Sequence, residues 1–166
     1  MERVLVIGSN GAGKTTFSEK LSQKTGLPLV HIDKIYWRGC WEVTPRDTFE
    51  TAVLAEAKKE RWIIEGNNIR SLSQRLPYAD TVFWFEFPPV ACTLHIIKRA
   101  IKYRNKARPD MPDQCINKLG VRFLRDAWRF NRKNRLTIQS LLEEAGDITM
   151  VRFTNRRQVR SYLQKI

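Results

Sequence analysis

The sequence predicts an α/β fold, with a parallel sheet in the middle and helices on both faces. Five apolar runs of strand length alternate with segments whose apolar residues recur at helical spacing. Strands that alternate with helices are joined by right-handed crossovers, which place the strands in one parallel sheet. A glycine-rich turn joins the first strand to the first helix. With 166 residues the chain suits one domain, so we expect a single domain over residues 1–166.

The expected strands are apolar runs, several of them rich in β-branched residues. In order they cover residues 4–7, 27–32, 61–65, 81–87 and 148–153. The first of them is apolar without interruption, which is typical of a strand buried on both faces. We expect the second strand to end at Asp33, where a connection rich in aromatic residues begins.

The expected helices carry an apolar stripe or a start signal. They cover residues 15–24, 44–60, 68–76, 88–103, 115–145 and a last segment capped by Asn155. In the first helix, Phe17 and Leu21 lie four residues apart on one face. Thr44 is the expected N-cap of the second helix, and Pro45 lies in its first turn. We expect the long fifth helix in two pieces, with a break near residues 131–134.

The motif G-x-x-x-x-G-K-[ST] follows the first strand directly. Its residues are Gly8, Ser9, Asn10, Gly11, Ala12, Gly13, Lys14 and Thr15, and Thr16 comes next. A strand before it and a helix after it are the context that the phosphate-binding P-loop requires; a chance match would be a glycine-rich turn and an exposed lysine. Glycines let the backbone approach an oxygen cluster, and the loop N–H groups with the helix dipole attract an anion.

The last residues of the motif predict ATP and Mg²⁺ as the bound cofactors. Lys14 can reach the β- and γ-phosphates as a point charge. The Thr15 hydroxyl suits one ligand position of Mg²⁺, because magnesium keeps several waters and takes few protein oxygens.

Polar residues follow several of the strands, at the sheet edge where ligands of parallel α/β proteins bind. Asp33 could accept a proton from a substrate hydroxyl or hold magnesium through water, or it could be a simple cap. Glu65, Gly66 and Asn67 could bind polar groups of a substrate or form only a turn. Glu86 ends the fourth strand, a usual place for a carboxylate that orders a magnesium-bound water.

Most of the positive charge lies in one segment. The chain carries a net charge of +13, and residues 98–135 hold thirteen lysines and arginines against three aspartates. One interpretation is a basic helical lid over residues 99–135, in which Arg99, Arg104 and Arg108 clamp phosphates and stabilise charge in the transition state.

The same segment allows two other interpretations. Arg122, Arg125, Arg129 and Arg132 recur at three- and four-residue spacing, so they form one basic helical stripe. Such a stripe could lie along the phosphates of a nucleic acid. It could also be a solvated helix face, which is common for charge runs.

Cysteine usage and hydropathy exclude several classes of protein. Cys40, Cys92 and Cys115 are widely spaced, and no C-x-x-C pair indicates zinc, so we expect reduced thiols in a cytoplasmic protein. There is no signal-peptide pattern, and no apolar run reaches membrane-spanning length, so no membrane partner is expected.

The chain resembles the DNA topology modulation proteins, bacterial P-loop proteins that are similar to adenylate kinases and shikimate kinases. The matching pieces are residues 6–9, 11–16, 26–28, 31–37, 41, 44–46, 61–67 and 108–111. The resemblance implies an adenylate-kinase-like, three-layer P-loop fold with a five-stranded parallel sheet of order 2-3-1-4-5, and binding of ATP with magnesium. Glu65 and Glu86 depart from it, since relatives more often have Asp at both positions.

The sequence supports two functional hypotheses. One is a kinase that transfers the γ-phosphate of ATP to a small acceptor, such as a nucleoside, a nucleotide or another hydroxyl compound. The alternative is a nucleotide-gated nucleic-acid-binding protein that affects DNA topology. The acceptor, the base preference and the oligomeric state do not follow from the sequence.

Overall fold

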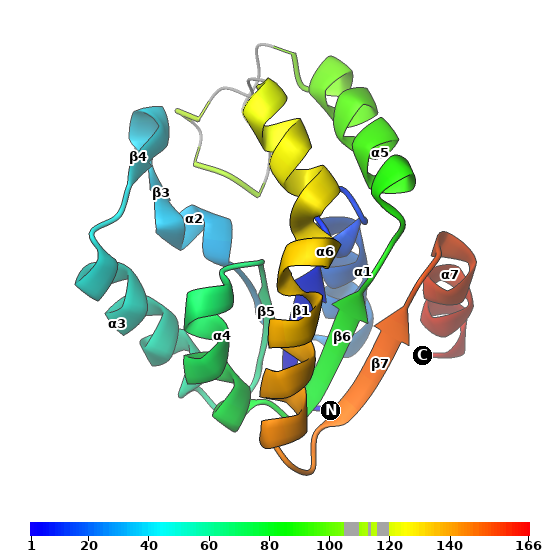
Figure 1. Ribbon diagram of the computed structural model, residues 1–166. Helices are drawn as coiled ribbons and strands as arrows, with labels where there is room; N and C mark the ends of the chain where they lie inside the picture. Colours follow the sequence, from blue (N-terminus) through cyan, green and yellow to red (C-terminus); the bar gives the residue numbers. More distant parts are fainter. Residues whose placement is uncertain (105–109, 113, 116–119) are drawn as a thin grey trace.

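The centre of the molecule is a sheet of five parallel strands (Figure 1). The computed structural model describes residues 1–104, 110–112, 114–115 and 120–166. The strands are β1 (Arg3–Gly8), β2 (Leu29–His31), β5 (Trp62–Glu65), β6 (Thr81–Phe85) and β7 (Thr149–Phe153). Their order is β2-β5-β1-β6-β7, and every neighbouring pair is parallel. Numbered along the chain, this is the order 2-3-1-4-5 that the resemblance implies, and that prediction is confirmed.

Helices cover both faces of this sheet, as the three-layer prediction requires. They are α1 (Lys14–Thr25), α2 (Ile32–Tyr36), α3 (Arg46–Ala57), α4 (Ile69–Arg75), α5 (Pro89–Lys102), α6 (Val121–Glu144) and α7 (Arg156–Lys165). Short elements complete the described part: β3 (Trp37–Arg38) and β4 (Glu42–Val43) pair antiparallel, and 3-10 turns span Gly39–Trp41 and Leu76–Tyr78. No helix in the described part of the chain combines the length and hydropathy of a membrane span.

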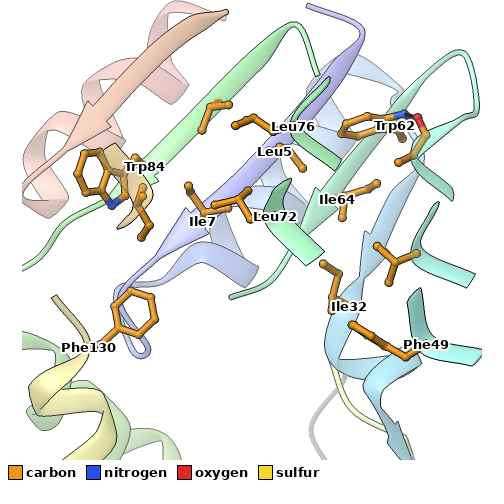
Figure 2. Packing of buried hydrophobic residues seen from close by; sticks show 14 residues of the cluster. Leu5, Ile7, Ile32, Phe49, Trp62, Ile64, Leu72, Leu76, Trp84 and Phe130 are labelled. Atoms are coloured by element: carbon orange, nitrogen blue, oxygen red, sulfur yellow. Dashed lines mark hydrogen bonds between the residues drawn. The ribbon is translucent and has the colours of Figure 1, made fainter. Parts of the chain in front are cut away.

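Two apolar clusters hold the helices on the sheet. On one face, Leu5, Ile7 and Trp84 pack with side chains of α3, α4 and α6, among them Phe130 (Figure 2). On the other face, α1 and α7 pack against the sheet, and Phe17 of α1 is fully buried there. Its ring makes edge contacts with the rings of Phe83, Phe85 and Phe153, at centroid distances of 4.9–5.6 Å. Alternation along the strands therefore supplies both faces with core residues.

Three local predictions need correction. The second strand ends at His31, and Asp33 lies within the short helix α2. Thr44 does not cap α3, because its hydroxyl donates to the Ile35 carbonyl oxygen at 2.7 Å and Pro45 holds the N-cap position.

The predicted break in the long helix is also wrong, since α6 is continuous through residues 131–134. The reason is that both asparagine side chains find hydrogen-bond acceptors, one within the helix and one outside it. Asn134 donates its amide to the Phe130 carbonyl oxygen at 3.0 Å, four residues back, and Asn131 donates to the Phe87 carbonyl oxygen at 2.8 Å. Both amides therefore find acceptors without interrupting the helix. The sequence predicts that this helix starts at residue 115. The described part of α6 begins at Val121, and residues 116–119 lie outside the described part.

Candidate functional site

Two glycines of the P-loop have a positive φ and lie where a side chain would clash with neighbouring backbone. Gly8 has a φ of +123°, and a Cβ on it would lie 2.1 Å from the Phe85 carbonyl oxygen. That oxygen accepts the Ser9 N–H at 2.8 Å, so the loop is fastened to the end of β6. Gly11 has a φ of +81°, and its Cβ would lie 2.5 Å from the Cys92 carbonyl oxygen of α5. Glycine at both positions lets the loop pack this closely against β6 and α5.

Lys14 is the first residue of α1 and is only 7% exposed. Gly13 precedes it in the left-handed conformation and turns the chain into the helix. The Lys14 Nζ donates to the carbonyl oxygens of Gly8 at 3.0 Å and Ser9 at 3.1 Å, so the ammonium group folds back across the loop. Burial lowers the pKa of Lys14, because desolvation penalises its charged form. An anion bound in the loop would favour the charged form of Lys14 and offset this desolvation.

Charges from three other elements converge on this ammonium. The carboxylates of Glu65 and Asp33 act to raise the pKa of Lys14, and the Arg99 guanidinium acts to lower it. These residues come from the end of β5, from α2 and from α5. Asp33, Glu65 and Arg99 therefore all lie near enough to the Lys14 ammonium to affect its charge. Their roles in substrate binding and catalysis stay predictions.

The Thr15 hydroxyl faces two carboxylates. Its Oγ1 lies 3.4 Å from Glu65 Oε2 and 3.5 Å from Asp110 Oδ2. The same Glu65 oxygen lies 3.0 Å from His31 Nδ1, which fixes the carboxylate in place. Asp110 is buried, with 8% of its surface exposed. A hydroxyl with carboxylates beside a phosphate loop is a donor set that fits Mg²⁺. No group of three or more His, Cys, Asp or Glu forms a metal cage among the described residues.

Glu86, for which a magnesium-ordering role is predicted, pairs with two arginines, and that role stays a prediction. Its Oε1 lies 3.1 Å from Arg135 Nε of α6, and its Oε2 pairs with the Arg152 guanidinium of β7. The carboxylate is 9% exposed. The structure therefore gives Glu86 two arginine partners and places Glu65 and Asp110 at the Thr15 hydroxyl.

Two predicted substrate-binding residues support the loop. Asn67 Oδ1 accepts the Gly8 N–H at 2.9 Å, and its amide donates to Asn10 Oδ1 at 2.8 Å. Gly66 has a φ of +148°, and a Cβ there would lie 2.8 Å from Ile32 Cβ at the start of α2. Asn67 thus ties the P-loop to β5, and Gly66 allows α2 to approach. Their contact with a substrate stays a prediction.

The structure describes three of the remaining predicted residues but not Arg108. Ala12 is buried, with its N–H donating to the Ser9 carbonyl oxygen at 3.2 Å, and Thr16 is exposed on α1. Arg104 is exposed in the turn after α5. Arg108 lies outside the described residues.

Two contacts to the loop were not predicted. Asn131 Oδ1 accepts the Ser9 hydroxyl at 2.5 Å, and His95 of α5 donates its Nδ1 hydrogen to the Gly11 carbonyl oxygen at 2.7 Å. The donor assignment for His95 follows because a carbonyl oxygen only accepts. Asn131 stands directly after the buried Phe130, so a polar residue beside the apolar stripe of the helix was the available signal. Asp110 was missed as well, although it lies in the matching piece at residues 108–111.

Comparisons with known proteins show the fold. The protein-family models and the curated proteins give no match. A shikimate kinase from Acinetobacter baumannii in complex with shikimate has a TM-score of 0.61 at 22% identity, covering 99% of this chain and 90% of that one. A sugar kinase from Janibacter has a TM-score of 0.52 at 14% identity, covering 99% and 91%. An uncharacterised protein from Eubacterium ventriosum has a TM-score of 0.52 at 12% identity, covering 99% and 96%.

These identities show the fold alone, and membership of the DNA topology modulation proteins stays a resemblance. The parallel sheet with helices on both faces agrees with the likeness to shikimate kinase. The chain therefore has the α/β fold of the P-loop kinases, related to that of shikimate and adenylate kinases.

Proposed function

We propose that the protein is an ATP- and magnesium-dependent phosphotransferase that transfers the γ-phosphate to a hydroxyl group of a small acceptor. The observation that carries this proposal is the buried Lys14 ammonium, folded across a loop of backbone amides, with the Thr15 hydroxyl beside it. Such a loop binds phosphate groups through its N–H groups and the helix dipole. Lys14 would turn from the loop carbonyls to the β- and γ-phosphates.

The residues around Thr15 would hold the metal ion. The Thr15 hydroxyl would supply one oxygen ligand, and the Glu65 and Asp110 carboxylates beside it would accept hydrogen bonds from water on the metal ion. Bound Mg²⁺ neutralises charge on the β- and γ-phosphates. His31 keeps the Glu65 carboxylate oriented toward this position.

Asp33 and Arg99 would act on the acceptor and the transferred group. Asp33 lies in the first turn of α2, and its carboxylate acts to raise the pKa of Lys14. We propose that its carboxylate accepts the proton of the attacking hydroxyl as a general base. Arg99 would stabilise the negative charge on the transferred phosphoryl group in the transition state. Arg104 and Arg108 would supply further positive charge from the lid.

Small hydroxyl compounds are the acceptor class that we favour. Shikimate, which is bound in one structural neighbour, belongs to that class. Nucleosides and nucleotides remain within the proposal, since the P-loop side of the site is the same for all of them.

The test is an acceptor screen with purified protein, ATP and Mg²⁺, followed by kinetics on the best acceptor. Asp33→Asn should lower kcat by at least about a hundredfold, the usual contribution of a positioned base. Asp47→Asn, an exposed aspartate in the first turn of α3, is the matched control and should leave kcat unchanged. Phosphorylation of no acceptor in the screen, or full activity in Asp33→Asn, would contradict the proposal.

A second candidate function rests on the exposed arginines of α6. Arg125, Arg129 and Arg132 are all exposed, which a nucleic-acid contact along this helix requires. Reversing the charge of Arg125 and Arg129 should then abolish a duplex DNA gel shift at about 100 mM salt, where phosphate contacts still register. Lys58→Glu, at the exposed C-cap of α3, is the control. Absence of any shift in the unmodified protein would remove this candidate.

A further inference from the structure

A cavity of about 340 Å³, which Lys14 does not line, lies at the β7 edge of the sheet. The loop after β6, the middle of α6 and the edge strand β7 line it, and it is open to solvent. Three arginines line it: Arg132 and Arg135 from α6, and Arg152 from β7. Phe87 and Pro88 form an apolar part of its wall. The volume is at the lower end of the range for small-molecule sites.

The cavity holds more positive than negative charge. Glu86 is the one carboxylate among its lining residues, and it pairs with both Arg135 and Arg152. Arg132 makes no ion pair with any residue that the structure describes. Two carboxylate oxygens cannot satisfy three guanidinium groups with five N–H donors each. Two net positive charges are therefore left for an anion.

The arginines are partly fixed and partly open to a ligand. Arg152 lies over the Trp84 ring, 5.4 Å from its centroid, and Arg135 is anchored by Glu86. Their side chains remain 40% and 50% exposed, respectively, so N–H groups still face solvent. Pre-oriented guanidinium forks that keep free donors suit the several oxygens of a phosphate group.

We propose that this cavity binds the phosphate group of a small phosphorylated ligand, as a second anion site separate from the P-loop. The three arginines contact the phosphate oxygens, and Phe87 and Pro88 contact the apolar part of the ligand. The cavity is distinct from the Lys14 and Thr15 site, since none of the hydrogen-bond partners that the structure gives these two residues lines it. One polar contact does join the two regions, because Asn131 in the cavity wall accepts the Ser9 hydroxyl of the P-loop.

The experiment is a titration with inorganic phosphate at constant ionic strength, read from the NMR signals of the arginine Nε–H groups. The protein carries Lys14→Ala, so that the P-loop does not compete for the probe. Saturable shifts at Arg132, Arg135 and Arg152 are expected. Arg132→Ala should weaken the affinity about tenfold, the effect of losing a charge-assisted hydrogen bond. Arg125→Ala, an exposed arginine of the same helix outside the cavity, should leave it unchanged.

A second variant is expected to bind phosphate more tightly, a result that misfolding of the protein could not produce. Glu86→Gln removes the carboxylate that competes with the ligand for Arg135 and Arg152, so phosphate should bind several-fold more tightly. Equal affinities in the Arg132→Ala and Arg125→Ala proteins, or weaker binding to a folded Glu86→Gln protein, would overturn the proposal. Displacement of phosphate from these signals by duplex DNA at lower concentration would overturn the assignment to a small ligand.

Discussion

Gly8→Ala should destabilise the protein strongly, because the new Cβ meets backbone and not a movable side chain. It would lie 2.1 Å from the Phe85 carbonyl oxygen. Relief requires β1 and β6 to separate by about 1 Å, to reach ordinary packing distances. This motion would break the hydrogen bond from Ser9 N–H to that oxygen. The lost bond, the overpacking and the strain at φ +123° together predict a cost of about 3–5 kcal/mol.

Gly13→Ala is the matched control for this prediction. Gly13 has a φ of +93°, but a Cβ there would meet no atom within 4 Å. Its cost should be the backbone strain alone, about 1–2 kcal/mol. Urea unfolding followed by far-UV circular dichroism measures both variants. Equal losses in the two variants, or a loss below about 1 kcal/mol in Gly8→Ala, would refute the close contact between the loop and β6.

Two further predictions concern α5 and the core. Burial lowers the pKa of His95 below its usual 6.5, so the unfolded state takes up the proton more readily. The free energy of unfolding should therefore fall between pH 7 and pH 5, and it should fall further in the unmodified protein than in His95→Gln. Urea titrations at both pH values measure this, and an equal fall in the two proteins would contradict the burial of the ring. Phe17→Ala should cost about 3–5 kcal/mol, because its ring packs on three phenylalanines, whereas Leu94→Ala at a 56% exposed position of α5 should cost far less. Similar thermal midpoints for these two variants would contradict the packing of α1 on the sheet.

The strands and the phosphate loop could be predicted because their signals are local. Each buried strand is an apolar run that its own residues define, and the loop motif lies between such a run and a helix. The cap of α7 is local in the same sense, since Asn155 accepts the Gln158 N–H three residues on. The strand order, in contrast, came from the resemblance to known P-loop proteins and not from the pattern of residues.

The site residues that could not be predicted depend on partners distant in the chain. Glu86 stands at a strand end, as a magnesium-ordering carboxylate does, but β7 and α6 bring arginines to it from residues 135 and 152. Asn131 contacts Ser9 across 122 positions of sequence. Thr44 has the residue type of a cap, yet a carbonyl oxygen nine positions earlier takes its hydroxyl. A local pattern gives the residue type and the element, whereas the choice among polar partners depends on tertiary packing.

The binding of ATP by the P-loop is tested most directly by calorimetric titration of the protein with ATP and Mg²⁺. Lys14→Ala should weaken binding at least about tenfold, since it removes the ammonium that we propose contacts the phosphates. Lys24→Ala is the control, because Lys24 lies in the last turn of the same helix and donates to the Ile166 carbonyl oxygen. Weaker binding in Lys14→Ala, with unchanged binding in Lys24→Ala, is the expected result. A folded Lys14→Ala protein that binds ATP as tightly as the unmodified protein would contradict a phosphate site in this loop.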